Sequence, residues 1–303
     1  AGGGDRRPTQ QAGRGQQGGA ARARGGAGTE GGGARRIEKD LITGAAGSIG
    51  AVLRSGLAGH YQLRLSDVAP LGAPGRGEEH DGAELSDLAQ VEAAMAGMDA
   101  VVHLGAIATE ADFDSLLGPN FIGAYNVFEA ARRQGVRRVV YASSNHAVGF
   151  YPTDRRIGPD VAQRPDGFYG VGKAFGENLG CLYFHKWGIE CACLRIGSFL
   201  VAPTETRHLS TWISHGDMVR LVRCCLDAPL VGFAVLYGVS ANTRGWWDNP
   251  DAARLGYHPQ DNAEDYAEDI PRAAPPADPK DPAVRFMGGF IAAIDYDRKK
   301  GMP

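Results

Sequence analysis

One tyrosine and one lysine in this sequence have the residue types and the spacing for proton chemistry. Tyr169 and Lys173 lie four residues apart in Tyr-Gly-Val-Gly-Lys, a spacing that puts two side chains on one face of a helix. A phenol with a pKa of about 10 is a poor base at neutral pH, and a nearby ammonium lowers that pKa because it favours the phenolate. We therefore predict that Tyr169 accepts a proton and that Lys173 helps it to do so.

A hydroxyl for the same reaction lies upstream, in the polar run Ser143-Ser144-Asn145-His146. This run follows the apolar stretch Arg138–Ala142, which is typical of a buried strand. At the end of that strand, Ser144 could hydrogen-bond a substrate oxygen while the oxygen loses its proton. A Tyr-x-x-x-Lys pair alone is most often a surface pair on a helix, so the preceding serine makes the catalytic interpretation much more specific.

A glycine-rich turn follows the apolar run Leu41–Thr43 and reads Gly-Ala-Ala-Gly-Ser-Ile-Gly. Gly44 permits a tight turn, Gly47 lets the backbone approach a pyrophosphate, and Gly50 allows a helix to pack closely on the strand. The N-terminus of that helix then offers free N–H groups and the positive end of its dipole to phosphates. Glycine spacing alone is weak evidence in a chain with 44 glycines, so a dinucleotide site needs support from the next strand.

That support comes from Asp67, which ends the next expected strand about 20 residues further on, where dinucleotide-binding folds carry a carboxylate. A carboxylate there accepts hydrogen bonds from both hydroxyls of the adenine ribose and repels a 2′-phosphate, which selects NAD over NADP. The alternative for Asp67 is a solvated turn residue. With NAD as the cofactor, Lys173 would also hold the nicotinamide ribose.

Short β-rich runs alternate with helical stretches after residue 36, which is the pattern of a parallel sheet covered on both faces. The strands are expected at Leu41–Thr43, Gln62–Ser66, Ala100–Leu104, Arg138–Ala142, Cys191–Ile196 and Phe233–Tyr237. Helix-period apolar residues occur in Ser86–Ala96, Ile122–Gln134, Gly170–Trp187 and Asp217–Ala228. We predict an α/β fold with a Rossmann-like, doubly wound parallel sheet. The start of the first strand stays open, because Glu38, Lys39 and Asp40 stand where a buried strand usually reads apolar.

The composition divides the chain into three parts. Residues 1–36 contain 13 glycines and seven arginines, and their only apolar side chains are alanines and Pro8. They cannot bury enough apolar surface to offset the entropy lost when a chain becomes ordered. We expect them to form a disordered Gly/Arg-rich tail. Residues 37–197 are expected to form the NAD-binding Rossmann domain. Strand signals become rare after residue 197, which predicts a small C-terminal substrate-binding cap at 198–303, with some segments returning to the Rossmann sheet.

Charge and cysteine usage bear on partners and compartment. The tail carries a net charge of +5 and could touch RNA or another polyanion, although a solvated extension is the simpler interpretation. The other residues sum to −8, so no nucleic-acid partner is expected for the folded part. The five cysteines lack CxxC spacing and nearby histidines, which indicates neither a metal site nor a disulfide framework. Reduced thiols favour the cytoplasm, and no stretch reaches the roughly 18 apolar residues of a membrane helix.

Together these motifs resemble the extended short-chain dehydrogenase/reductase superfamily and, within it, the uronate dehydrogenases. The resemblance runs from Leu41 to about Gly289. The superfamily marks are the glycine turn, Asp67, Asn120 and the pair of Tyr169 and Lys173. The motifs that resemble uronate dehydrogenases in particular carry the inference about the substrate. They are residues 142–146, 164–166, 194–198, Arg207 with the segment 209–212 that follows it, 240–242 and 246–249.

The resemblance implies an NAD-dependent enzyme that oxidises C1 of D-glucuronate or D-galacturonate to an aldarolactone, with hydride transfer to NAD. It implies that the catalytic residues are Tyr169, Lys173 and Ser144. The implied cofactor contacts are Gly44, Gly47, Ser48, Ile49, Gly50, Asp67, Glu84, Leu85, Leu104, Gly105, Ala106, Asn120, Tyr169 and Lys173. The implied substrate contacts are Ala108, Ser144, Asn145, His146, Ser198 and Arg207. Relatives often pair through the helices after Asn120 and Tyr169, so a homodimer or higher homo-oligomer is expected.

Two of the substrate residues can be weighed by their own chemistry. The guanidinium of Arg207 is suited to grip the C6 carboxylate of a hexuronic acid at two points. Without the resemblance, Arg207 could also be an exposed arginine in a polar loop. We interpret His146 as a substrate-binding side chain, with a purely structural histidine equally open, because Tyr169 already serves as the base.

Three residues depart from the family pattern. Ala108 stands where relatives usually have a serine that touches the sugar, and losing one neutral hydrogen bond costs about 0.5–1.5 kcal/mol. Glu84 replaces an aspartate near the adenine but keeps the acceptor, and Gly172 replaces the serine that usually precedes Lys173. None of the three touches the path of the proton or the hydride. Ala108 leaves the identity of the sugar open.

Two other functions compete with the dehydrogenase hypothesis. A nucleotide-sugar epimerase or dehydratase uses the same Ser/Tyr/Lys frame but needs a larger cap than residues 199–303 offer. A dinucleotide-sensing regulatory protein without turnover belongs to another class. Intact Tyr169, Lys173 and Ser144 count against it, because a sensor needs no base.

Overall fold

Among the residues that the structure describes, seven parallel strands form one sheet in the order β3-β2-β1-β4-β5-β6-β9. This computed structural model describes residues 1–2, 38–270 and 278–297, so the expected tail lies outside the described residues except for its first two. The strands are β1 (Lys39–Thr43), β2 (Gln62–Ser66), β3 (Glu78–Asp81), β4 (Ala100–His103), β5 (Arg138–Ser144), β6 (Glu190–Ile196) and β9 (Phe233–Gly238). The doubly wound parallel sheet predicted from the sequence is confirmed.

The strand β3 was not predicted from the sequence. It reads Glu-Glu-His-Asp and lies at the edge of the sheet, beside β2. An edge strand has a neighbour on one side and keeps charged, partly exposed side chains, so no apolar run marks it. Each of the other six strands begins and ends within two residues of its expected bounds.

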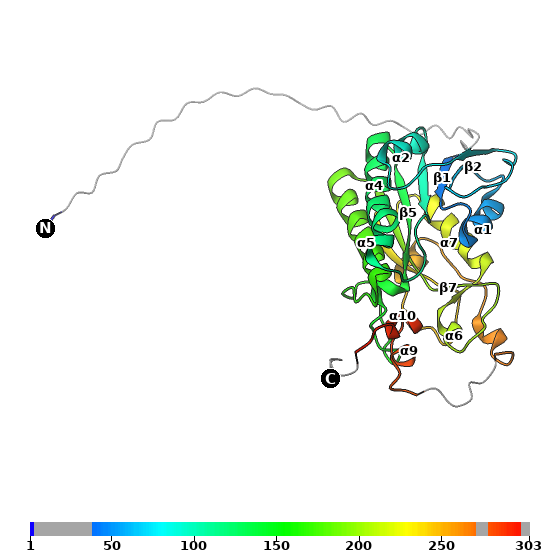
Figure 1. Cartoon of the computed structure of the whole chain (residues 1–303), viewed down its shortest axis with the longest axis vertical. Coiled ribbons are helices and arrows are strands. Elements are labelled where there is room, and N and C mark those ends of the chain that lie inside the picture. The colour runs from blue at the N-terminus through cyan, green and yellow to red at the C-terminus, as the bar shows by residue number, and fades with distance from the viewer. Residues whose placement is uncertain (3–37, 271–277, 298–303) are drawn as a thin grey trace, which may run out of the picture. The chain divides into compact units, whose positions relative to one another are not determined.

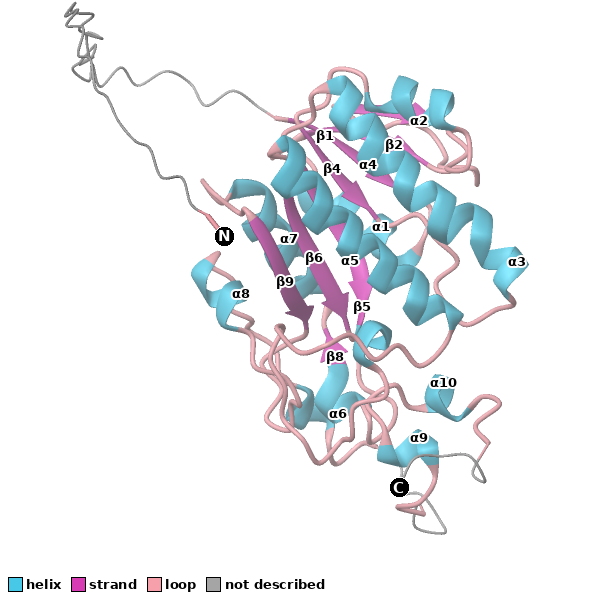
Figure 2. Cartoon of the chain, turned by 90° about the vertical axis from the view of Figure 1, so that its left-hand side faces the viewer, coloured by secondary structure: helices cyan, strands magenta, loops and turns pink. Residues whose placement is uncertain are grey.

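Helices cover both faces of this sheet (Figure 2). One face is covered by α1 (Ser48–Leu57) and α7 (His215–Asp227), and the other by α2 (Leu88–Met95), α4 (Gly123–Gln134) and α5 (Phe168–Trp187). Consecutive residues of a strand point to opposite faces, so Ile42 joins the core under α1 and α7 while Leu41 joins the other core. The expected helix from Ile122 begins earlier, because α3 (Phe113–Leu116) and a π-helical turn (Leu117–Ile122) lead directly into α4.

The charged start of β1 has a physical consequence. The strand begins at Lys39, two residues before the expected start, and Asp40 is completely buried in it. Neither carboxylate oxygen of Asp40 has a hydrogen-bond partner among the described residues. Burial, together with the nearby charges of Glu38 and Asp99, raises the pKa of Asp40 to about 7. The irregular sequence therefore marks a buried titratable group at the amino edge of the sheet.

The carboxyl edge of the sheet is covered by short elements that come mostly from the second half of the chain. In Figures 1 and 2 these lie at the end to which the strand arrowheads point. Of the short elements, α8 (Pro250–Arg254) lies beside the edge strand β9 instead. Those at the carboxyl edge include β7 (Ser198–Phe199), α6 (His208–Thr211), β8 (Trp212–Ile213), α9 (Pro282–Arg285) and α10 (Phe290–Ala293). The chain after residue 197 thus supplies α7 and β9 to the layers of the sheet and these short elements to its carboxyl edge.

Candidate active site

The carboxyl edge of the sheet holds a cavity of about 660 Å³. It opens beside β1, where the sheet continues to β2 on one side and to β4 on the other, and ligands of open α/β sheets bind at such a point. Every residue expected at the site lines this cavity except Asn120. The lining also includes residues that were not expected as ligand contacts: Ser66, Val68, Ala83, Ile107, Pro119, Ala142, Ser143, Ile196, Gly197 and Phe199.

The glycine turn forms a cradle that side chains would fill. Gly44 has a φ of +70°, and a Cβ on it would lie 2.5 Å from the backbone nitrogen of Gly105. A Cβ on Gly50 would lie 2.6 Å from the carbonyl oxygen of Ala45. No side chain caps the start of α1 at Gly47, and no acid stands in its first turn. The first N–H groups of α1 are therefore free to bind an anionic group such as a pyrophosphate.

Asp67 lies beside this turn at the end of β2. Its Oδ2 accepts a hydrogen bond from the backbone N–H of Ala46 at 2.9 Å, and its Oδ1 accepts one from Ala69 at 2.9 Å. These bonds fix the carboxylate at the rim of the cavity, beside Glu84 and Leu85. The cradle, the free helix N-terminus and this carboxylate fit the pyrophosphate and adenine ribose of NAD.

Asn120 does not line the cavity but supports a loop that does. It is buried, its Oδ1 accepts a hydrogen bond from the backbone N–H of Ile107, and its Nδ2 donates to the carbonyl oxygen of Ile107, both at 2.9 Å. Ile107 belongs to the lining loop that runs from Leu104 to Ala108. The structure thus places Asn120 as a support for this loop, where the sequence led us to expect a cofactor contact.

The three expected catalytic residues come together from two elements. Ser144 ends β5, while Tyr169 and Lys173 lie on α5, and all three are buried. The Oγ of Ser144 accepts a hydrogen bond from the backbone N–H of His146 at 3.2 Å, which leaves its own hydrogen for another acceptor. The Nζ of Lys173 donates to the carbonyl oxygen of Ala142 at 2.7 Å and lies 5.6 Å from the ring centre of Tyr169.

Burial dominates the proton affinities of this trio. It raises the pKa of Tyr169 to about 12, and the hydrogen bond with Ser144 opposes that shift. Burial also lowers the pKa of Lys173 to about 8. We expected Lys173 to lower the pKa of Tyr169, but the loss of water around the buried phenol dominates and raises it. Tyr169 therefore holds its proton at neutral pH until a further positive charge enters the site.

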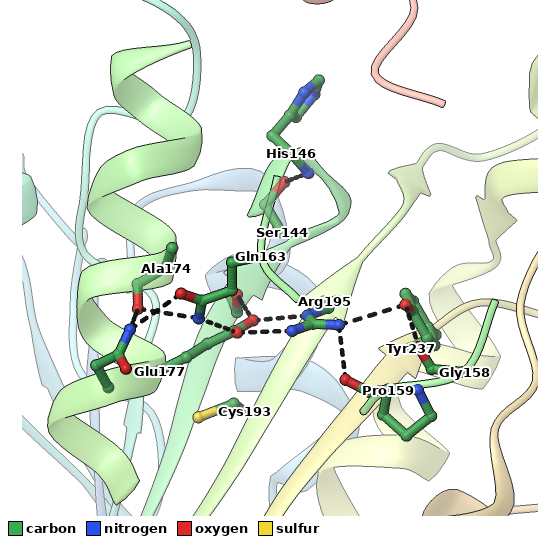
Figure 3. Close-up of polar contacts among 12 residues, drawn as sticks. Ser144, His146, Gly158, Pro159, Gln163, Ala174, Glu177, Cys193, Arg195 and Tyr237 are labelled. Carbon is green, nitrogen blue, oxygen red and sulfur yellow. Dashed lines mark hydrogen bonds and ion pairs between the residues drawn. The ribbon is translucent and has the colours of Figure 1, made fainter. Parts of the chain in front are cut away.

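A buried ion pair between Glu177 and Arg195 joins α5 to β6 (Figure 3). Glu177 lies one turn after Lys173, and both of its oxygens accept hydrogen bonds from Arg195 at 2.9 Å. Glu177 also accepts a bond from the hydroxyl of Ser143 at 2.6 Å and one from Gln163 at 2.9 Å. These contacts lock α5 against the strand ends, and thereby fix the distance between the phenol and the serine.

The N-terminus of α5 has an unexpected partner. The carboxylate of Glu110 accepts hydrogen bonds from the backbone N–H groups of Phe168 at 2.8 Å and Tyr169 at 2.9 Å. The carboxylate pairs with the N–H groups of the first helical turn, which a capping side chain usually does; Gly167, the residue that precedes the helix, has no side chain to do so. Since Glu110 stands 58 residues before the helix in the sequence, no local pattern could have revealed this contact.

Arg207 presents a largely buried guanidinium to the half of the cavity away from the glycine turn, which we call the sugar half. Its Nε and Nη2 donate to the carbonyl oxygen of Met287 at 3.2 and 2.7 Å, and its Nη1 donates to Ser198 at 3.3 Å. With its amide oxygen turned toward Arg207, Asn145 accepts from Nη2 at 2.9 Å and donates to Ile196 at 3.0 Å. Burial lowers the pKa of Arg207. No carboxylate of the described residues forms an ion pair with it, so the charge is available to an anionic ligand.

His146 faces the same half of the cavity and has a carboxylate partner. Its Nδ1 lies 2.9 and 3.1 Å from the two oxygens of Asp166, whose side chain is completely buried. A carboxylate accepts hydrogen bonds, so Nδ1 carries the hydrogen and Nε2 is the nitrogen left for a ligand. The sequence showed Asp166 only as part of a family motif, and its contact with His146 depends on the fold.

The described residues contain no cluster of three or more His, Cys, Asp or Glu side chains that could hold a metal ion. All five cysteines are free thiols. No helix within residues 38–270 and 278–297 is both long and apolar enough to cross a membrane.

Comparison with known proteins agrees with this geometry. Residues 41–257 match the model of the NAD dependent epimerase/dehydratase family. A uronate dehydrogenase of Agrobacterium fabrum is 50% identical over 254 residues, which cover 84% of this chain and 96% of that protein. A variant of the Agrobacterium tumefaciens uronate dehydrogenase, solved in complex with NAD, is 48% identical with a TM-score of 0.81 and covers 84% of this chain and 97% of its own. A glucuronic acid dehydrogenase structure from Chromohalobacter salexigens is 43% identical with a TM-score of 0.82, covering 85% and 97%.

Proposed function

Because this chain belongs to the uronate dehydrogenases, within the NAD dependent epimerase/dehydratase family, we propose that it oxidises C1 of a hexuronic acid with NAD. The product is the corresponding aldarolactone. The observation that carries this proposal is the guanidinium of Arg207, which faces the cavity of Tyr169 and Ser144 without an ion-pair partner among the described residues. An arginine of this kind suits a sugar that bears a carboxylate.

The half of the cavity between the glycine turn and Asp67 would hold NAD. The N–H groups at the start of α1 would bind the pyrophosphate, and Asp67 would accept hydrogen bonds from the hydroxyls of the adenine ribose. When bound, NAD supplies the hydride acceptor and a positive charge at the nicotinamide ring. Lys173 holds the nicotinamide ribose with the ammonium hydrogens that Ala142 leaves free.

The proton of the C1 hydroxyl goes to Tyr169. Burial raises its pKa to about 12, and positive charge at NAD and at Lys173 would lower that value toward the range of a working base. Ser144 donates its hydrogen to the C1 oxygen and steadies the sugar there. Glu177 and Arg195 keep Tyr169 and Ser144 at a fixed separation.

The carboxylate end of the sugar goes to Arg207. Its Nη1 has two hydrogens, of which Ser198 takes one, so at least one remains for the C6 carboxylate. Asn145, whose amide oxygen lies 2.9 Å from Nη2 of Arg207, and the Nε2 of His146 help Arg207 to anchor the acid. Binding energy gained at C6 thereby orients C1, at the other end of the sugar. Residues after 197, among them Ser198 and Arg207, form the substrate cap.

An assay of NADH formation against a panel of sugars tests this function. The panel contains D-glucuronate, D-galacturonate, D-glucose, D-galactose, UDP-glucose and UDP-galactose. We expect rapid NADH formation with the two uronates and slow formation with the uncharged sugars. NADH formation from UDP-sugars without NADH formation from uronates would indicate a UDP-sugar dehydrogenase and would overturn the proposal. Conversion of UDP-glucose into UDP-galactose without net NADH formation, measured on the same samples by chromatography, would indicate an epimerase and would overturn it as well.

We propose further that the chain forms a homodimer through α3, α4 and α5. Four aromatic rings make a continuous row there: Phe168 to Phe113 at 5.8 Å, Phe113 to Phe121 at 5.5 Å, and Phe121 to Phe175 at 5.6 Å. Nearby Ile122, Tyr125, Val171 and Leu182 are also exposed, and exposed apolar patches of this kind mark interfaces. Light scattering should give at least twice the chain mass, and Phe175→Arg should lower it; a monomeric parent would contradict the proposal.

A cytoplasmic location is also part of the proposal. It is supported by the five free cysteines, since thiols stay unpaired in a reducing compartment. Fractionation of cells that express the chain checks this, and recovery outside the cytoplasmic fraction would contradict it.

A further inference from the structure

The turn Met287–Gly289 packs against Arg207, which lines the sugar half of the cavity, although the turn comes from the far end of the chain. It connects α9 to α10, which lie at the same end of the sheet as α6 (Figures 1 and 2). It also lies beyond residue 257, where the match to the broad epimerase/dehydratase family ends. The backbone N–H of Met287 donates to Tyr151 at 2.8 Å, and that of Gly288 donates to Gly149 at 2.9 Å. The turn is therefore buried and firmly held.

The first contact of this turn is with Arg207. The carbonyl oxygen of Met287 accepts hydrogen bonds from two nitrogens of the guanidinium. Gly289 packs against the same group, because a Cβ on it would lie 2.7 Å from Nε of Arg207. Its φ of +64° also favours glycine. The turn thus fixes the plane of the guanidinium and excludes any side chain from the space that the guanidinium fills.

The second contact is with Asp166. A Cβ on Gly288 would lie 1.5 Å from Oδ2 of Asp166, and a Cβ on Gly149 would lie 2.1 Å from the same oxygen. The carboxylate therefore fills a slot between two glycines, and it is there that it meets Nδ1 of His146. The slot keeps the carboxylate in place, and the carboxylate keeps the imidazole in place.

We propose that the turn Met287–Gly289 is a positioning element that determines the preference for a carboxylate-bearing sugar. It acts on Arg207 directly and on His146 through Asp166. This inference rests on the proposed function, because it assigns the determinant of substrate choice within the same site. Neither the turn nor Asp166 touches the reacting atoms, so both act mainly on sugar binding; the charge of Asp166 also contributes to the raised pKa of Tyr169.

Two glycine variants with matched controls test the proposal. Gly288→Ala places a methyl group on Asp166, whereas Gly158→Ala adds a methyl group that meets nothing within 4 Å. Gly289→Ala places a methyl group on Arg207, whereas Gly256→Ala shares the positive φ but again meets nothing. Each control thus reproduces the backbone change of its partner without the contact.

The readouts are KM and kcat for D-glucuronate and for D-glucose, and the Kd of NAD. We expect Gly288→Ala and Gly289→Ala to raise KM for glucuronate by about tenfold to a hundredfold, the effect of misplacing a binding group by about 1 Å. KM for glucose and the Kd of NAD should stay close to the parent values, as should all constants of the two controls. Equal losses on both sugars, or a glucuronate KM no higher than in the controls, would overturn the proposal.

A double variant covers the case in which Gly288→Ala destabilises the protein. Asp166→Ala combined with Gly288→Ala removes the overlap, so its melting temperature should return toward that of the parent. Its KM for glucuronate should stay high, because His146 has lost its partner; a KM restored along with stability would overturn the role of Asp166. If the parent itself does not oxidise uronates, the proposed function fails. If the parent does so and the glycine variants keep its KM, only this inference fails.

Discussion

In the function proposed above, the two halves of the cavity recognise their ligands with different parts of the chain. The cofactor half relies on the backbone: the free N–H groups of α1, the bare glycines of one turn, and Asp67 not far behind them in sequence. The sugar half relies on charged and polar side chains from segments far apart, such as His146 on Asp166 and Arg207 on Met287. A backbone site needs only glycine and helix geometry, so one short segment encodes it. A site for a carboxylate needs a desolvated cation held on several sides, which one segment cannot provide.

The largest effect is expected where the two halves meet. Tyr169→Phe removes the proton acceptor, so turnover should fall by about 10²–10⁴-fold or more on every sugar. The Kd of NAD, measured by titration, should change little, because the phenol hydroxyl contributes to chemistry more than to cofactor binding. Substantial turnover by this variant would assign the base to another residue.

The next effect should be confined to the sugar half. Arg207→Ala leaves the substrate carboxylate in a partly buried site without its partner, at a cost of about 2–5 kcal/mol in transition-state stabilisation. We expect kcat/KM for glucuronate to fall by tens to thousands of fold, and that for glucose to fall much less. Arg207→Lys should recover little, because an ammonium cannot reproduce the planar set of donors that faces Met287 and Ser198. Equal use of both sugars by Arg207→Ala would remove the distinction between the halves.

A change confined to the cofactor half should leave sugar preference untouched. Asp67→Ala removes an acceptor for the ribose and the negative charge that repels a 2′-phosphate. The ratio of kcat/KM with NAD to that with NADP should drop by about tenfold to a hundredfold, as expected for a charged hydrogen-bonding group. The ratio of glucuronate to glucose activity serves as the internal control. Comparable use of NAD and NADP by the parent would contradict the role given to Asp67.

A smaller effect is expected at Ala108, on the rim of the sugar half. Ala108→Ser adds one neutral hydrogen bond to the sugar, worth about 0.5–1.5 kcal/mol. KM for the preferred uronate should fall by up to about tenfold, or the preference between glucuronate and galacturonate should shift. Identical constants for both uronates would show that this position does not contact the sugar.

A substitution of Asp40, at the amino edge of the sheet, should change stability without affecting either half of the cavity. Burial raises the pKa of Asp40 from its ordinary 3.8 to about 7, so between these values the unfolded chain loses this proton while the folded protein keeps it. Stability from Asp40 is therefore lost as the pH rises through this window, by about 1–4 kcal/mol. Asp40→Asn does not titrate, so its melting temperature relative to the parent should be higher at pH 8 than at pH 5, with kinetic constants unchanged. An equal difference at both pH values would contradict a buried, titrating Asp40.

The amino-acid sequence by itself determined the type of fold and most of the cavity lining. Apolar runs of strand length, helix-period stretches and the glycine turn depend on local geometry, and local geometry is visible in neighbouring residues. The same reasoning missed β3, because an edge strand with charged side chains carries no apolar signal. The amide of Asn120, which we expect at the cofactor, bonds the backbone of Ile107 in the loop that lines the cavity, a contact that no local pattern indicates.

Only the tertiary structure decided which groups support the side chains that face the ligands. Glu110 on the start of α5, Asp166 on His146, Glu177 on Arg195 and Met287 on Arg207 all join residues between 18 and 80 positions apart. Such contacts follow from how strand ends and loops converge at one edge of the sheet, and no sequence spacing records that convergence. Only the tertiary structure decided the proton affinities as well. The residue types suggested that Lys173 lowers the pKa of Tyr169. In the folded protein the pKa of Tyr169 is raised, because burial excludes the water that would stabilise the charged phenolate.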